Sequence, residues 1–225
     1  MVKADTLTKQ SSSYRVFQVL RDRIVSGIYV PGSLMSEKDI LEEFKVSRTP
    51  YRTALQQLEA MSLVKIIPRY GTIVSEIDLN EIISAYEVRL RLETMAAELS
   101  AQRRNEEDIA EFQKYLSKFA PTEDARDVIR ETKIDTHLHE LTCKASKNQI
   151  LTEYLYNLRL ICSRIWTTSW WNNYDLGLMK EHWKIMWTCW ETKNSQEAST
   201  VMNAHIQHSI DILKSNVFTS SHDNT

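Results

Sequence analysis

The chain has 225 residues and a formal net charge of −2; 42% of its residues are hydrophobic and 26% are charged. Such a composition excludes wholesale disorder. No stretch has the roughly 18 consecutive apolar residues of a membrane-spanning helix, and the N-terminus lacks the apolar core of a secretory signal. Three cysteines without a CxxC spacing argue against a disulfide framework. Together these features predict a cytoplasmic protein without a membrane partner.

The first third of the chain predicts three helices and a hairpin. Residues 1–13 are polar and are expected to form a flexible tail. Apolar residues recur at helical spacing over 14–26, 36–44 and 48–62, and β-branched runs flank a turn within residues 63–75. Helix, short helix, turn, helix and hairpin make a winged helix-turn-helix. We place this domain at residues 14–76 and a linker at 77–81.

The rest of the chain predicts helices only. Of the four glycines, Gly177 alone lies beyond residue 71, so turn-forming residues are scarce there. Helices are expected at 79–102, 106–119, 123–146, 148–170, 175–192 and 195–214. They form a predicted domain over 82–215, followed by a disordered tail at 216–225. The predicted fold class is mainly α, a winged helix-turn-helix with a small β-hairpin wing followed by an all-α helical bundle.

Two arginines lie at the start of the third predicted helix. Arg48 and Arg52 are four residues apart and therefore share one helix face. The start of a recognition helix reaches base edges in the major groove, where the arginine fork matches guanine O6 and N7. Residues 1–78 carry 11 Lys and Arg against 9 Asp and Glu, a net charge of +2. A solvated helix face would also explain the arginines, but the surrounding helix-turn-helix favours DNA binding.

Ligand-type residues recur in the predicted bundle. Asp135 and His139 are four residues apart on one helix, and His182 and His205 follow on two later helices. One carboxylate and three imidazoles that converge would suit Zn²⁺, Ni²⁺, Mn²⁺ or Fe²⁺. Scattered helical histidines are more often surface or satisfied core residues, so both interpretations stay open from spacing alone. Three neighbours are not expected to be ligands: His137, His208 and Cys143.

All six tryptophans lie between residues 166 and 190. Trp183, Trp187 and Trp190 are four and three residues apart and so form one helical stripe. Core packing is the first interpretation. The alternative is that one or two of them line a ligand cavity, because such cavities are mostly apolar and aromatic.

Residues 14–76 resemble the DNA-binding domain of GntR-family bacterial transcription regulators. The resemblance is carried by Pro31-Gly32-Ser33-Leu34, by the VSRTPxRxAL run at 46–55 and by Gly71. It implies a set of DNA-contacting residues in the helices and the wing: Lys38, Ser47, Arg48, Thr49, Arg52, Tyr70 and Gly71. Lys38 stands where many members have Arg, which leaves the operator sequence open. Met61-Ser62 replaces the usual acidic-Gly pair, a change expected to affect packing only.

Residues 82–213 resemble the effector domain of the FCD (FadR C-terminal domain) branch of that family. YEVRLRLETMAAELSA at 86–101 and DTHLHELTCKASKNQIL at 135–151 are two of the matching segments. The resemblance implies a divalent metal ion, Zn, Ni or Mn, held by Asp135, His139, His182 and His205. It also implies a small organic acid bound by the metal and by Arg89, a homodimer, and a palindromic double-stranded DNA operator.

The predicted function is therefore a transcription regulator, and more specifically a repressor that a carboxylate metabolite controls. One alternative is a metal-dependent, hydrolase-like enzyme that uses the Asp/His site to activate water. The chain has no HExxH motif and no clear general base, so an enzyme is not predicted. The other alternative is a constitutive DNA-binding protein with a structural metal.

Overall fold

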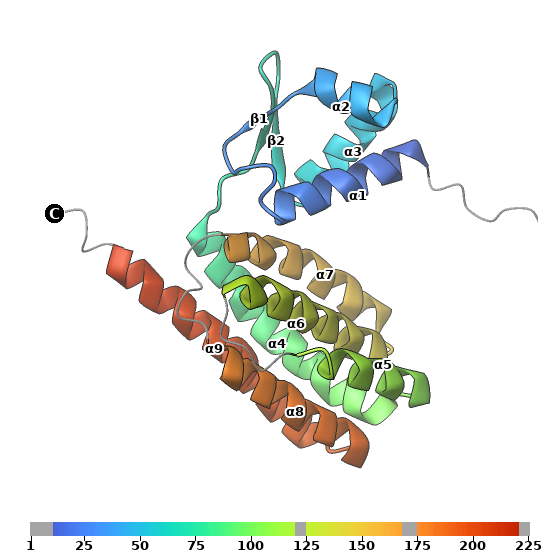
Figure 1. The fold of residues 1–225 in the computed structure, drawn as a ribbon, viewed down its shortest axis with the longest axis vertical. Coiled ribbons are helices and arrows are strands. Elements are labelled where there is room, and N and C mark those ends of the chain that lie inside the picture. Colours follow the sequence, from blue (N-terminus) through green and yellow to red (C-terminus); the bar gives the residue numbers. More distant parts are fainter. Residues whose placement is uncertain (1–10, 120–124, 168–174, 221–225) are drawn as a thin grey trace, which may run out of the picture. The chain divides into compact units, whose positions relative to one another are not determined.

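The computed structural model describes residues 11–119, 125–167 and 175–220. Its contacts divide the chain into two units. One is Met1–Asp78 with Ser163–Thr168, and the other is Leu79–Cys162 with Ser169–Thr225. The first unit holds the only sheet of the described residues, and the second is built from helices (Figure 1).

The first unit is a winged helix-turn-helix. Its helices are α1 (Ser12–Val25), α2 (Glu37–Phe44) and α3 (Arg48–Ala60), and its strands are β1 (Leu34–Met35), β2 (Val64–Ile67) and β3 (Gly71–Val74). The strands form an antiparallel sheet in the order β1-β3-β2, with Leu34 opposite Ile73 and Val64 opposite Val74. The predicted hairpin is β2–β3, and β1 is an additional strand. The predicted fold class is confirmed for this unit.

Local signals explain where these helices begin and which face is buried. The Ser11 side chain accepts a hydrogen bond from Tyr14 N, and the Ser36 side chain accepts one from Asp39 N. One side of each helix enters a shared core that includes Val16, Leu20, Ile40, Phe44, Leu55 and Leu58, together with Val64 and Val74 of the sheet. The core thus fixes α3 by its buried face and leaves the opposite face free for contacts.

Ser62 adopts a left-handed backbone conformation between α3 and β2, with φ of 56°. A left-handed conformation is disfavoured in L-residues by roughly 1–2 kcal/mol, whereas glycine adopts it without a steric penalty. The serine that stands where the family usually has glycine therefore strains the backbone. The expectation that this replacement affects packing only is wrong.

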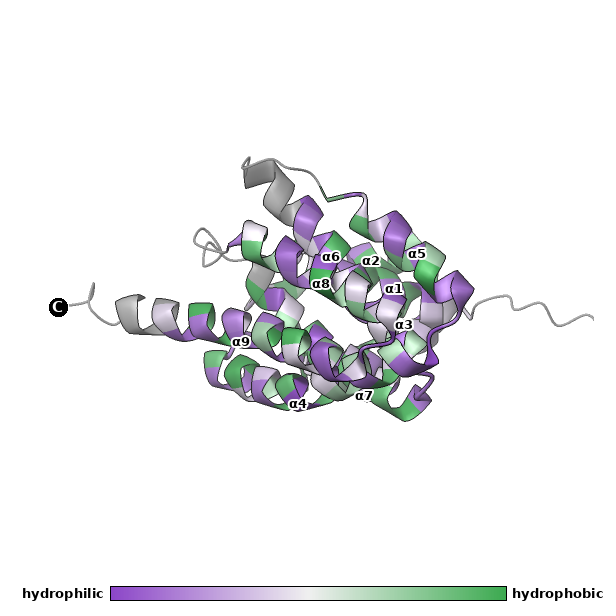
Figure 2. Ribbon diagram, turned by 90° about the horizontal axis from the view of Figure 1, so that it is seen from below, coloured by the Kyte–Doolittle hydropathy of each residue, from purple (hydrophilic) through white to green (hydrophobic). Residues whose placement is uncertain are grey.

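The second unit consists of six α-helices in the described residues. They are α4 (Leu79–Arg103), α5 (Glu106–Leu116), α6 (Ala125–Ala145), α7 (Gln149–Ser163), α8 (Leu176–Thr192) and α9 (Ser195–Ser220). Helix α4 packs along α9 and α6, α5 packs against α6 and α8, and α8 packs against α9. Hydrophilic and hydrophobic residues alternate around these helices (Figure 2), as expected of amphipathic helices that share a core.

Several boundaries differ from the predicted ranges. Helix α4 begins at Leu79 as the predicted helix does, so its first turn overlaps the segment assigned to the linker. Helix α7 ends at Ser163, before the predicted end at residue 170, and the short 3-10 helix η1 (Arg164–Thr167) follows. Helix α9 continues to Ser220 through residues expected in the disordered tail, a stretch that contains no Gly or Pro. None of the described helices combines the length and apolar composition that crossing a bilayer requires.

Candidate metal centre and DNA-binding face

Three buried ligand-type side chains meet in the second unit. The structure brings Asp135, His139 and His205 together with donor atoms that all lie within 4.8 Å of one another. His205 Nε2 lies 3.2 Å from His139 Nε2 and 3.2 Å from Asp135 Oδ1, and His139 Nε2 lies 3.6 Å from Asp135 Oδ2. Two imidazole nitrogens and a carboxylate therefore converge on one small volume.

The helices explain this convergence. Asp135 and His139 lie one turn apart on α6, so their side chains leave the same face. His205 comes from α9, and both helices pack against α4. The cluster is almost completely buried in the core of the bundle. The packing of the helices thus brings His205 to the Asp135–His139 pair, which the Asp-x3-His spacing alone did not predict.

The protonation of these groups suits cation binding. Burial lowers the pKa of His139, which favours the neutral imidazole. Burial alone would raise the pKa of Asp135, but its electrostatic interaction with the His139 ring and its hydrogen bond with His205 lower it to about 2. A carboxylate beside imidazole nitrogens is the donor set of a transition-metal site.

Two outer side chains orient the cluster. His139 Nδ1 lies 3.1 Å from Glu93 Oε2, so an Nδ1–H that donates to this carboxylate leaves the Nε2 lone pair facing Asp135 and His205. Trp183 donates its indole N–H to Asp135 Oδ1 at 2.7 Å. The Trp183 ring also lies 4.9 Å from the His139 ring and 5.1 Å from the His205 ring, measured between centroids.

The fourth predicted ligand, His182, lies next to this cluster rather than within it. Its ring centroid is 5.6 Å from that of His205, and its donor atoms are outside the 4.8 Å group. Burial and the imidazoles of His205 and His208 lower the pKa of His182 to about 4. Its buried Nδ1 has no hydrogen-bond partner among the described residues. An orphaned neutral imidazole at this position fits a site that is completed by a cation.

Arg89 is buried and paired with Glu93. Its Nη2 lies 3.1 Å from Glu93 Oε1, and its guanidinium lies 4.8 Å from the Tyr86 ring centroid. Arg159 from α7 also contacts Glu93 Oε1, at 3.4 Å, and lies 3.1 Å from Cys143 Sγ. Glu93 therefore joins two arginines to the metal-type cluster through His139.

Sequence reasoning missed Glu93 and Arg159. The only local signal was the i, i+4 spacing of Arg89 and Glu93 on one helix, which ordinarily marks a surface ion pair. Nothing in the sequence placed Arg159 on the same carboxylate.

The neighbours not predicted as ligands lie outside the three-residue group. His137 stacks on Tyr115 with ring centroids 3.5 Å apart. Burial raises the pKa of the Cys143 thiol to about 12, which disfavours the thiolate that metals require. His208 is half-buried, one turn after His205 on α9.

The described tryptophans pack in the core of the bundle, as the first interpretation predicted. Trp183, Trp187 and Trp190 all contact the Phe112 ring, and Trp190 donates its N–H to Ser100 Oγ, which is core packing. Trp183 in addition lies against the metal-type cluster. The side chains of Trp166, Trp170 and Trp171 lie outside the described residues.

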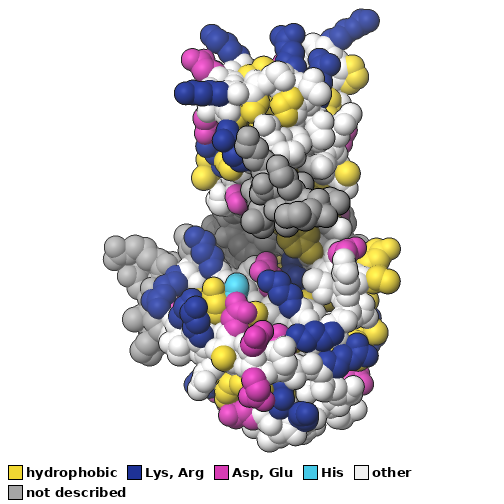
Figure 3. Space-filling model, turned by 90° about the vertical axis from the view of Figure 1, so that its right-hand side faces the viewer, with side chains coloured by type: hydrophobic (Ala, Val, Ile, Leu, Met, Phe, Trp, Pro, Cys, Tyr) yellow, Lys and Arg dark blue, Asp and Glu magenta, His cyan; other side chains and the backbone are white. Residues whose placement is uncertain are grey.

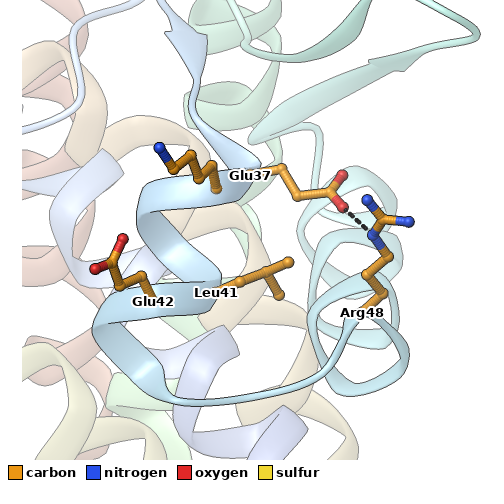
Figure 4. A pocket seen from close by; sticks show the side chains of 5 residues that line it. Glu37, Leu41, Glu42 and Arg48 are labelled. Carbon is orange, nitrogen blue, oxygen red and sulfur yellow. Dashed lines mark ion pairs between the residues drawn. The ribbon is translucent and has the colours of Figure 1, made fainter.

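The predicted DNA-contacting residues lie on the surface of the winged unit. All seven are exposed: Lys38 on α2, Ser47, Arg48, Thr49 and Arg52 at the start of α3, and Tyr70 and Gly71 at the hairpin turn. Lys and Arg side chains project from this unit on the face shown in Figure 3. Arg48 Nε lies 3.0 Å from Glu37 Oε1 at a depression between α2 and α3 (Figure 4). Gly71 has φ of 135°, which L side chains rarely adopt.

Solved structures of low sequence identity share the fold. McbR/YncC of E. coli covers 92% of this chain and 99% of its own, with a TM-score of 0.77 and 20% identity. A GntR transcriptional regulator from Rhodococcus sp. RHA1 covers 90% and 97%, with a TM-score of 0.72 and 19% identity.

Sequence comparisons identify the family. Residues 13–74 match the bacterial regulatory proteins of the gntR family, and residues 84–208 match the FCD domain. The HTH-type transcriptional regulator LutR of Bacillus subtilis is 30% identical over 213 residues, 84% of this chain and 95% of LutR. The gluconate operon transcriptional repressor of B. subtilis is 41% identical over 95 residues, 42% of this chain and 39% of that protein. These relatives are transcriptional regulators rather than enzymes, and the chain belongs to the FCD branch of the GntR family of bacterial DNA-binding transcription regulators.

Proposed function

We propose that this regulator is a repressor whose DNA binding is controlled by a small carboxylate at a divalent-metal centre. The observation that carries the proposal is the convergence of Asp135, His139 and His205 in the bundle core. The orphaned Nδ1 of His182 supports a fourth ligand. Repression is supported by relatives that are named repressors, the gluconate operon repressor and E. coli RspR. The site of action is the bacterial cytoplasm, where the chromosome lies.

In this proposal, four residues hold the metal ion and Arg89 holds the effector. Asp135, His139, His205 and His182 would hold Zn²⁺, Ni²⁺ or Mn²⁺, the ions that imidazole and carboxylate donors suit. The ion when bound supplies a Lewis-acidic anchor for a carboxylate oxygen. Arg89, whose fork matches a carboxylate, would hold the acid from another side in exchange for its contact with Glu93.

DNA recognition is assigned to the exposed start of α3, with α2 and the wing in support. Arg48, Arg52 and Lys38 would read base edges, while Ser47 and Thr49 would contact phosphates. Tyr70 and Gly71 would place the wing on the backbone or in the minor groove. A two-fold dimer of such domains matches a palindromic operator.

The exposed apolar side chains of α4 and α7 suggest the dimer surface. Val88 and Met95 on α4 and Ile150 and Tyr154 on α7 are exposed, Ile150 to 70% and Tyr154 to 64%. The two helices pack together through Ala96, Leu151 and Leu155. Exposed apolar residues that gather in one region mark interaction sites.

A charge in this surface should prevent the dimer. We expect Tyr154→Glu to convert a wild-type dimer into a monomer in sedimentation equilibrium, because an unpaired carboxylate would be buried at the interface. Leu178→Glu on α8 is the matched control, since Leu178 is also an exposed apolar residue but lies on another helix. A Tyr154→Glu protein that remains as dimeric as the control would contradict this surface.

The effector proposal is tested by operator binding. A site selected by the wild-type protein from randomised duplexes serves as the operator, and gluconate, acetate, succinate and citrate serve as probes. We expect at least one probe to weaken operator binding of metal-loaded protein by about 5- to 150-fold, the usual range of allosteric coupling. Arg89→Lys should lose this response, since lysine keeps the charge but lacks the fork.

Arg91→Lys is the control, because Arg91 is exposed on the same helix. An Arg89→Lys protein that responds as Arg91→Lys does would remove Arg89 from the effector site. No response of metal-loaded wild type to any probe would contradict carboxylate control.

A further inference from the structure

The ion pair between Glu37 and Arg48 joins the first residues of two helices of the winged unit. Glu37 begins α2 and Arg48 begins α3, and Arg48 Nε lies 3.0 Å from Glu37 Oε1 (Figure 4). Both helices are anchored in the core of the unit. Helix α2 contributes Ile40 and Phe44, and α3 contributes Leu55 and Leu58. The two helix starts that carry Glu37 and Arg48 are therefore held close to each other.

The pair occupies only one part of the guanidinium. Nε is bound to Glu37, and no further hydrogen bond or ion pair joins the terminal nitrogens of Arg48 to the described residues. Two nitrogens of the fork thus remain for a bidentate contact with guanine O6 and N7. Arg52, one turn later on the same helix face, has no ion pair or hydrogen bond with any side chain in the described part of the chain. Of these two arginines, the structure pre-orders Arg48.

Stability does not explain the pair. The side chains are 74% and 43% exposed, and exposed ion pairs contribute little to folding. A carboxylate on a DNA-binding face also repels phosphates and so weakens binding to any duplex. An ordered arginine side chain, in contrast, loses less conformational freedom when it binds. A carboxylate here therefore favours discrimination between sequences over general affinity.

We propose that Glu37 is a positioning residue for sequence readout, one that orients Arg48 and raises the preference for the operator over other DNA. The inference rests on the base-reading role given to Arg48 above. It predicts a specific division of effects. Removal of the carboxylate should reduce discrimination between operator and random DNA, although it removes a negative charge from the DNA-binding face.

The experiment compares binding to two duplexes by fluorescence anisotropy. One duplex is the site that the wild-type protein enriches from a randomised pool, and the other is a scrambled duplex of equal composition. For Glu37→Ala we expect unchanged or tighter binding to the scrambled duplex. The ratio of the two affinities should fall by about 3- to 10-fold, part of the value of one bidentate contact. Glu37→Gln, which keeps an acceptor for Nε, should retain most of the ratio.

Glu42→Ala is the matched control. Glu42 lines the same depression on α2 and has no ion pair with Arg48. The Glu42→Ala variant removes the same charge as Glu37→Ala, so it should tighten binding to both duplexes and leave the ratio of the two affinities unchanged. Circular dichroism of every variant checks that the helices form. A ratio that falls equally in Glu37→Ala and Glu42→Ala would overturn the positioning role.

Two further variants separate this inference from the proposed function. Arg48→Ala should lower the ratio of the two affinities by about 10-fold or more. The double variant Glu37→Ala/Arg48→Ala should have the same ratio as Arg48→Ala alone, because residues that act through one contact are non-additive. An Arg48→Ala protein with an unchanged ratio would overturn the base-reading role itself. A lowered ratio in Arg48→Ala with a wild-type ratio in Glu37→Ala would overturn only the inference about Glu37. A higher ratio in Glu37→Ala would also overturn the inference, because it would show that Glu37 competes with DNA for Arg48.

Discussion

Replacement of His205 by alanine is expected to remove the bound metal from the purified protein. His205 Nε2 lies 3.2 Å from both His139 Nε2 and Asp135 Oδ1, so it is the residue that links the α6 pair to α9. Loss of an outer partner alone typically lowers metal affinity by about 10- to 100-fold, and loss of a direct ligand should exceed that. We expect about one ion per wild-type chain after dialysis against Zn²⁺, Ni²⁺ or Mn²⁺, and almost none in His205→Ala, by elemental mass spectrometry.

His137→Ala is the matched control for this experiment. His137 lies on α6 between the two α6 ligands, but it stacks on Tyr115 and lies outside the cluster. It should keep the metal. His182→Ala should lose less metal than His205→Ala, because His182 lies outside the 4.8 Å group. Equal metal in His205→Ala and His137→Ala would remove the metal centre from the proposed function.

The His205→Ala variant also distinguishes a metal that senses the effector from a metal that stabilises the fold. A folded His205→Ala protein that binds the operator but ignores effectors supports a sensing role. Loss of the helical circular dichroism signal would instead support the alternative of a structural metal, since structural sites contribute directly to folding.

Much of the fold could be predicted because its signals are local. The apolar spacing of α1 and α3 and the Ser36 cap of α2 are readable within a few residues of chain. Strand β1 could not be predicted, because two residues are too few to show the alternation of apolar and polar side chains that marks a strand. The strand forms only through its pairing with β3. The end of α9 was misjudged since polar residues without Gly or Pro are compatible with either a helix or a tail.

The candidate site could be predicted only in part, for the same reason. The spacing of Asp135 and His139 is local, but their approach to His205 depends on how α6 and α9 pack, which the family resemblance implied and spacing did not. Neither the spacing nor the family resemblance pointed to Glu93. A glutamate four residues after an arginine normally indicates a solvated helix face, whereas the structure buries Glu93 completely. Burial of a charged residue is decided by its partners, and those partners come from α6 and α7.

Removal of the Glu93 carboxylate is expected to cause the largest loss of stability. Glu93 is 0% exposed and contacts Arg89 at 3.1 Å, Arg159 at 3.4 Å and His139 at 3.1 Å. In Glu93→Ala two buried guanidinium groups lose their carboxylate partner. Breaking a buried ion pair by removal of one partner lowers the free energy of unfolding by about 3–5 kcal/mol. Urea unfolding followed by tryptophan fluorescence measures this, because Trp183, Trp187 and Trp190 lie in the bundle.

Two comparisons show whether the uncompensated charge causes the loss. Glu98→Ala lies on the same helix at an exposed position and should change the free energy of unfolding by less than about 0.5 kcal/mol. Arg159→Met in the Glu93→Ala background removes one of the stranded cations, so it should restore part of the lost stability even though it deletes a further polar residue. A double variant less stable than Glu93→Ala would show that Arg159 stabilises the bundle through contacts other than Glu93, such as the one with Cys143. Recovery would instead show that the carboxylate is required because the two arginines are buried beside it.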